Sequence, residues 1–156
     1  MSLTEIRNFV LLDAPASDTA APIATGGQPS EGQLAEVAAA GYRRVVNLGL
    51  LDPKYCLPDE AALAASLGME YRHIPVRFDA PTLDDFRAFT AVMDAWAGEP
   101  VFVHCAANYR VSSFMALYGE LKLGWTRAQA DEHARRLWEP NETWRNFLEH
   151  ARATLV

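Results

Sequence analysis

The segment Val101–Arg110, with the sequence VFVHCAANYR, contains the residues of this chain best suited to chemistry. Its apolar first half predicts a buried strand, and Cys105 follows directly, ahead of a stretch that we expect to be helical from Val111. A cysteine at such a place meets backbone N–H groups and the positive end of a helix dipole, which favour a thiolate. Arg110 adds a cation that could hold an anion above the sulfur. We therefore predict a nucleophilic thiolate beside an anion site.

The loop between these two residues supplies the other candidate binding groups. Its backbone N–H groups could form a ring around an anion, together with the Arg110 guanidinium; they belong to Ala106, Ala107, Asn108, Tyr109 and Arg110. Such a tight loop needs a left-handed residue, and Asn108 is of a type that tolerates this conformation. We interpret His104 as a residue that orients the loop by hydrogen bonding. Tyr109 either packs or shapes the entrance beside the anion.

The elements around this loop alternate between strand and helix about four times before a helical C-terminal third. Strands are expected over 43–48, 70–76 and 101–104, and helices over 30–41, 59–68, 82–97 and, with two breaks, from 111 onward. Residues 14–24 are expected to form a connector. The alternation predicts an α/β fold with a central, mainly parallel sheet of four to five strands flanked by helices. Ligands bind such sheets beyond the carboxyl ends of the strands, where Cys105 lies.

Capping patterns support these helix boundaries. Ser30, Thr82 and Thr126 are each followed three residues later by a partner that completes a capping box, and Asn141 is a candidate N-cap. Gly41 is a natural left-handed stop for the first helix.

Length and charge limit the remaining possibilities. The 156 residues are the size of one ordinary domain, and we expect a single domain over residues 1–156. The net charge of −6 argues against nucleic-acid binding, because phosphate backbones are met by clustered Lys and Arg. Two cysteines are too few for a secreted disulfide framework, and no apolar run is long enough to span a bilayer. We expect a cytoplasmic protein that binds neither nucleic acid nor membrane.

The pattern His104-Cys105-x-x-Asn108-x-Arg110-x-Ser112 resembles the signature loop of the protein tyrosine and dual-specificity phosphatase superfamily. Further segments are similar to a bacterial branch of dual-specificity-like phosphatases: GGQPS at 26–30, VVNL at 45–48 and HIP at 73–75. The resemblance covers roughly residues 25–124. It implies a phosphotyrosine phosphatase-like fold, a phosphorylated protein or small molecule as substrate, and no metal or other cofactor.

The resemblance also implies roles for individual residues. Cys105 would be the nucleophile that forms a phosphocysteine intermediate, and Arg110 would bind the phosphate. His104 and Ser112 would support the loop. Asp79 would protonate the leaving group, although its place before Ala-Pro is equally well explained by a turn.

The loop departs from the family pattern in its length. The family usually places five residues between Cys and Arg, whereas four intervene here and Asn108 holds the glycine position. The shorter loop resembles that of rhodanese sulfurtransferases. Alternatively, Val111 occupies the arginine position, and the chain is a catalytically impaired phosphate-binding module. His104, the 26–30 block and Asp79 favour phosphate over sulfur, so we expect a cysteine-dependent phosphomonoester hydrolase.

Overall fold

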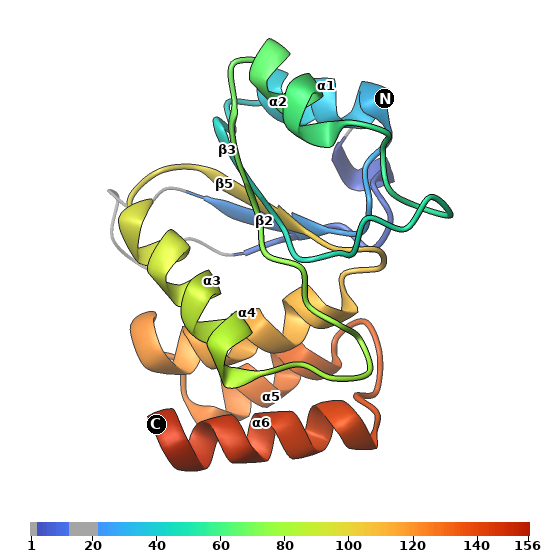
Figure 1. The fold of residues 1–156 in the computed structure, drawn as a ribbon. Helices are drawn as coiled ribbons and strands as arrows, with labels where there is room; N and C mark the ends of the chain where they lie inside the picture. Colours follow the sequence, from blue (N-terminus) through green and yellow to red (C-terminus); the bar gives the residue numbers. More distant parts are fainter. Residues whose placement is uncertain (1–2, 13–21) are drawn as a thin grey trace.

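A computed structural model describes residues 3–12 and 22–156 of the chain. Its strands are β1 (Val10–Leu11), β2 (Ile23–Gly26), β3 (Arg44–Asn47), β4 (Glu70–His73) and β5 (Val101–His104). Its helices are the 3-10 helix η1 (Leu3–Glu5) and α1 (Glu31–Ala39), α2 (Glu60–Ser66), α3 (Leu83–Ala95), α4 (Tyr109–Lys122), α5 (Arg127–Arg135) and α6 (Glu142–Leu155). In Figure 1 the sheet lies between α1 and α2 on one side and α3 to α6 on the other. None of the helices in the described ranges is long and apolar enough to cross a membrane.

The five strands form one sheet in the order β1-β2-β5-β3-β4. Strands β2, β5, β3 and β4 run parallel to their neighbours, and β1 pairs antiparallel with β2. His104, the last residue of β5, pairs with Gly26 of β2 and Asn47 of β3. The loops that follow these three strands therefore meet at one edge of the sheet. This arrangement confirms the predicted α/β fold with a mainly parallel sheet.

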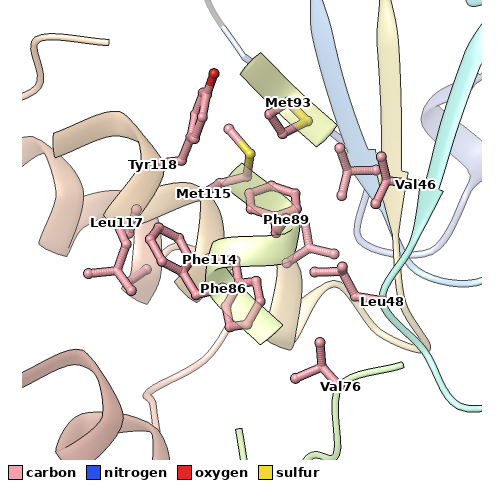
Figure 2. Packing of buried hydrophobic residues seen from close by; sticks show 14 of the residues in the cluster. Val46, Leu48, Val76, Phe86, Phe89, Met93, Phe114, Met115, Leu117 and Tyr118 are labelled. Atoms are coloured by element: carbon pink, nitrogen blue, oxygen red, sulfur yellow. The ribbon is translucent and has the colours of Figure 1, made fainter. Parts of the chain in front are cut away.

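Both faces of the sheet are covered by apolar cores. Val45 of β3 packs in the core beneath α1 and α2, whereas the next residue, Val46, packs in the core beneath α3 to α6. In the second core Phe89 of α3 and Phe114 of α4 have ring centroids 5.6 Å apart (Figure 2). Because both faces are buried, the central strands read as continuous apolar runs in the sequence.

The predicted helix starts are confirmed. Ser30, Thr82 and Thr126 each form a capping box, and the Asn141 side chain accepts a hydrogen bond from the backbone N–H of the third helical residue. Gly41 has a φ of 104°, as expected for the residue that follows α1.

Three predicted boundaries are wrong. The strand predicted over residues 70–76 ends at His73. The connector predicted over residues 14–24 fails at Ile23 and Ala24, which begin β2, while residues 14–21 lie outside the described residues. Strand β2 is short and contains small residues, and it is held by its pairing with β1 and β5 rather than by strong strand propensity. Helix α4 begins at Tyr109, two residues before the predicted Val111.

His133 of α5 is a buried imidazole in the helical layer. It is 9% exposed, and its ring centroid lies 5.3 Å from that of Trp125. Burial and, as the smaller cause, the charge of Arg136 together lower the pKa of His133 from 6.5 to about 4. The folded protein therefore holds this side chain neutral where the unfolded chain would protonate it.

This difference predicts a pH dependence of stability. The stabilising contribution is complete above the unfolded pKa of 6.5 and is lost as the pH falls through the folded value of about 4. We expect His133 to reduce the free energy of unfolding by about 1.4 kcal/mol per pH unit within this window. Urea denaturation at a series of pH values gives the free energy of unfolding as a function of pH. The slope of this free energy against pH should be shallower for His133→Gln than for wild type. His150→Gln, at an exposed position of α6, should keep the wild-type slope, and equal slopes for all three proteins would contradict the assignment.

Candidate active site

The loop that follows β5 lies at the edge of the sheet where the parallel strands end. Its backbone is tied to the neighbouring strand ends: Cys105 N donates to Gly26 O at 3.4 Å, and Gln28 N donates to Ala106 O at 3.0 Å. A Cβ added to Gly27 would lie 2.6 Å from Ala106 O, so only glycine permits this close approach. The segment after β2 therefore fixes the first part of the loop.

Asn108 ends the loop and begins α4. Its φ of 67° and ψ of 8° are left-handed, which confirms the conformation predicted from the sequence. Its side chain does not cap the helix, because its Nδ2 donates instead to Asn8 O at 2.8 Å and Thr25 Oγ1 at 3.0 Å. The first N–H groups of a helix have no acceptor within it. The start of α4 thus offers backbone donors and a positive dipole end to an anion.

Cys105 lies between the end of β5 and the N-terminus of α4. The side chain is 1% exposed and belongs to the core beneath α3 to α6, together with Val103 and Val111. The preceding residue, His104, faces the opposite layer. The chain thus directs the thiol toward α4 and places Val111, which is fully buried, in the apolar core rather than in the loop.

Arg110 is the second residue of α4 and is also buried, with 6% of its surface exposed. Its Nη1 donates to Val76 O at 2.8 Å, and its Cζ lies 5.9 Å from the centre of the Phe78 ring. Among the described residues, no carboxylate lies within ion-pair distance of Arg110. A buried charge without a counter-charge is unfavourable. A bound anion would supply the missing charge.

The segment that contacts Arg110 is fixed from α6. Trp144 is fully buried, and its Nε1 donates to Phe78 O at 2.8 Å. The Phe78 ring also packs against Trp138, with centroids 5.5 Å apart, and Trp138 stacks on Tyr109 at 4.7 Å with an interplanar angle of 9°. Tyr109 therefore packs beside the loop. The aromatic cluster of Phe78, Trp138 and Tyr109 fixes the segment that contacts Arg110.

Asp79 lies on this same segment but is directed to solvent. Its Oδ1 and Oδ2 accept hydrogen bonds from Arg77 at 3.1 and 3.0 Å, and its side chain is 72% exposed. The structure therefore brings the segment of Asp79 to Arg110 through Val76 and Phe78. In this arrangement the carboxylate itself is engaged by Arg77.

Ser112 and His104 support the loop from opposite sides. Ser112 Oγ donates to Asn108 O at 2.7 Å. His104 Nε2 lies 2.6 Å from Glu60 Oε2, and His104 Nδ1 lies 3.3 Å from Cys105 O. Both ring nitrogens of His104 thus face oxygen atoms.

Glu60 and Gln28 are site residues that the sequence reasoning missed. Gln28 Nε2 donates to Glu60 Oε1 at 2.7 Å, so both carboxylate oxygens are engaged. Burial would raise the pKa of Glu60, but hydrogen bonds from His104 and Gln28 and the charge of His104 hold it below its ordinary value. Gln28 was within the GGQPS block that carried the resemblance. Glu60 gave no signal, because an acid in the first turn of a helix is usually exposed.

A groove between α5 and α6, with a volume of about 460 Å³, is separate from the loop that follows β5. It contains Arg127 and Arg152, which are paired with Glu120 at the end of α4. Arg152 also binds Asp131. Its lining includes no residue of the loop after β5, so we do not assign it to the candidate site.

Comparison with known families identifies the family of the chain. The model of a family described as DSP-PTPase phosphatase fused to NAD+ kinase matches residues 8–146. The chain belongs to this phosphatase family. It is an enzyme of the protein-tyrosine and dual-specificity type, as its loop sequence suggested. No curated protein matches the chain.

Solved structures agree with this assignment. A DUF442 protein of Shewanella putrefaciens CN-32, assigned as a phosphatase, is 34% identical; the match covers 98% of this chain and 96% of that protein, with a TM-score of 0.80. Tk-PTP in its active form is 21% identical over 82% of this chain and 89% of its own, with a TM-score of 0.70. Kinase associated phosphatase is 15% identical over 96% of each chain, with a TM-score of 0.80, and shares the fold.

The buried pair behind the phosphatase loop generates a prediction. Removing one partner of a buried ion pair leaves the other uncompensated, so Glu60→Ala should lower the free energy of unfolding by about 3–5 kcal/mol. Glu70→Ala, which removes a pair with Arg44 whose Glu70 side chain is 54% exposed, should cost less than about 1 kcal/mol. Chemical denaturation measures both values. Similar costs for the two variants would contradict the role of Glu60.

The lowered pKa of Glu60 fixes the sign of its pH dependence. Its contribution is present above the ordinary carboxyl value of 4.5 and is lost as the pH falls through the lower folded value. The difference in stability between wild type and Glu60→Ala should therefore shrink in acid.

Proposed function

We propose that the chain hydrolyses phosphomonoesters through a phosphocysteine intermediate on Cys105. The observation that carries this proposal is Arg110, a buried guanidinium at the start of the helix that covers Cys105, with no counter-charge among the residues that the structure describes. Arginine can fork two oxygens of a phosphoryl group, and the free N–H groups of the helix start favour the same ligand.

The proposed reaction uses Cys105 as a thiolate. The positive end of the α4 dipole and a cation such as Arg110 are groups that stabilise a negative sulfur in general. His104, held by Glu60 at 2.6 Å, adds a nearby imidazole on the other side of the backbone. In this proposal the positive end of α4 and Arg110 stabilise both the bound phosphate and the thiolate, which lie close together.

The proposed reaction has two steps. The Cys105 thiolate attacks phosphorus and forms an S–P bond while the P–O bond to the leaving group breaks, and Asp79 gives its proton to the departing oxygen. Water then attacks the phosphocysteine, with the Asp79 carboxylate accepting a proton, and the S–P bond breaks to release phosphate and restore the thiolate. To act in this way, Asp79 must leave Arg77, which it binds in the present arrangement.

Two structural neighbours indicate the range of substrates for this fold. TpbA of P. aeruginosa, 17% identical with a TM-score of 0.59, is known in complex with pTyr. PTPMT1, 16% identical with a TM-score of 0.71, is known in complex with PI(5)P. For this chain we propose a phosphorylated protein or small molecule as substrate, and a cytoplasmic location.

The four-residue gap between Cys105 and Arg110 favours sulfur transfer as a second candidate. In that reaction the Cys105 thiolate would attack the sulfane sulfur of thiosulfate, the S–S bond of the donor would break to release sulfite, and Cys105 would hold the transferred sulfur as a persulfide. Family membership and the Asp79 segment favour phosphoryl transfer. A stable added sulfur on Cys105, detected by mass spectrometry in the absence of phosphatase activity, would favour the second candidate. Protection of the fold by phosphate without either reaction would indicate a binding module.

Replacement of the nucleophile tests the proposal directly. Cys105→Ser should reduce hydrolysis of an aryl phosphate by at least about a thousandfold, because the serine hydroxyl is a far weaker nucleophile than a thiolate. Arg110→Lys should lower kcat/KM by about a hundredfold, because an ammonium group cannot fork two phosphate oxygens. Cys56→Ser is the matched control and should retain activity. Full turnover by Cys105→Ser would exclude covalent catalysis at this residue.

The role of Asp79 depends on the leaving group. Asp79→Asn should reduce turnover of an alkyl phosphate by about a hundredfold, because a poor leaving group needs its proton. In the first step, cleavage of the P–O bond, the same variant should release a good aryl leaving group nearly as fast as wild type, measured as the pre-steady-state burst. Asp84→Asn, at an exposed position in the first turn of α3, serves as control. An equal loss of the first-step rate with both substrates would show that Asp79 is not the acid.

A further inference from the structure

Two asparagines in unusual backbone conformations are in contact at the loop that follows β5, residues 105–108. Asn8, with a φ of 51°, and Asn108, with a φ of 67°, are the non-glycine residues with positive φ among the described residues. They are 100 positions apart in the sequence, yet Asn108 Nδ2 donates to Asn8 O at 2.8 Å. Left-handed backbone is costly for residues other than glycine, and strain of this kind clusters at functional sites.

The contact between these two segments is reciprocal. Asn8 Nδ2 donates to Ala107 O at 2.9 Å, while Asn108 Nδ2 also donates to Thr25 Oγ1 at 3.0 Å. Asn108 is fully buried, and its Oδ1 has no hydrogen-bond partner among the described residues. Glycine would adopt the Asn108 conformation without strain or an unpaired oxygen. The asparagine is therefore explained by its donors rather than by its backbone conformation.

These donors determine which way the loop peptides face. The described peptides are trans, and in a trans peptide the C=O and the following N–H point in opposite directions. Ala106 O is held by Gln28 N, and Ala107 O is held by Asn8 Nδ2. The N–H group of Ala107 must then point away from Gln28 N, and the N–H group of Asn108 must point away from the Asn8 side chain.

We propose that Asn8 and Asn108 are positioning residues that together turn the loop N–H groups toward the bound phosphoryl group. This inference rests on the proposed function, because it assigns the loop N–H groups to the phosphate site proposed beside Cys105 and Arg110. The segment around Asn8 is thereby a part of the active site although it is remote in sequence. A loop of four residues has few peptides to offer, so the direction of each one matters for binding.

The test uses glycine variants, which keep the left-handed backbone and remove only the side-chain donors. We expect Asn8→Gly and Asn108→Gly each to weaken binding of inorganic phosphate by about tenfold and to lower kcat/KM similarly. The double variant should lose less than the product of the two single losses, because both act on one loop. Asn146→Ala, at an exposed position of α6, is the control and should bind phosphate as wild type does. Phosphate binding is measured by isothermal titration calorimetry and turnover with an aryl phosphate.

The outcomes separate this inference from the proposed function. An unchanged phosphate Kd in Asn8→Gly overturns the positioning role, even if its Tm is lowered, because a purely structural contact would affect stability alone. If Asn108→Gly does not fold, Asn8→Gly decides the question, since it retains both strained positions and the carbonyl acceptor. A third outcome is that the wild type binds phosphate without hydrolysing the substrate, while both glycine variants bind phosphate more weakly. This outcome would support the positioning role and overturn hydrolysis. Absence of phosphate binding in the wild type would overturn both.

Discussion

A buried cation without a counter-charge in the described part of the chain constrains the rest of this structure. Within residues 3–12 and 22–156, Arg110 has one carbonyl partner and one aromatic face, and it lies where α4 begins. Such a charge is unfavourable unless hydrogen bonds or an opposite charge compensate it. Phe78 is held by Trp144 of α6, so the outermost helix helps to fix the guanidinium. The helical layer thus contributes to the site as well as to the core.

The two helical layers contribute different parts of the loop environment. His104 and Cys105 are consecutive, but His104 is bound by Glu60 of α2, whereas Cys105 lies beneath α4. The layer of α1 and α2 therefore fixes the back of the loop, and the layer of α3 to α6 forms its front. Only a strand buried on both faces can present two neighbouring side chains in this manner. The central position of β5 is thus a requirement of the site.

Features that depend on local sequence could be predicted from it. The left-handed conformation of Asn108, the helix caps and the place of Cys105 after a buried strand follow from residue type and spacing. Features that depend on distant contacts could not be predicted. Glu60 resembles any first-turn acid until the fold buries it against His104, and Asn8 precedes an apolar run with no sign of its partner. Strand β2 was missed for the same reason, because its stability comes from its neighbours.

The clamp between Asn8 and the loop also affects the order of folding. Its hydrogen bonds join residues 99 and 100 positions apart, and the pairing of Ile23 in β2 with Val101 in β5 spans 78 positions (101 − 23). Contacts of such long range form slowly, because a large loop of chain must close before they stabilise anything. During synthesis on the ribosome, the N-terminal segment must wait until β5 has emerged. Nascent chains that stop short of β5 consequently lack the loop that we propose to bind an oxyanion.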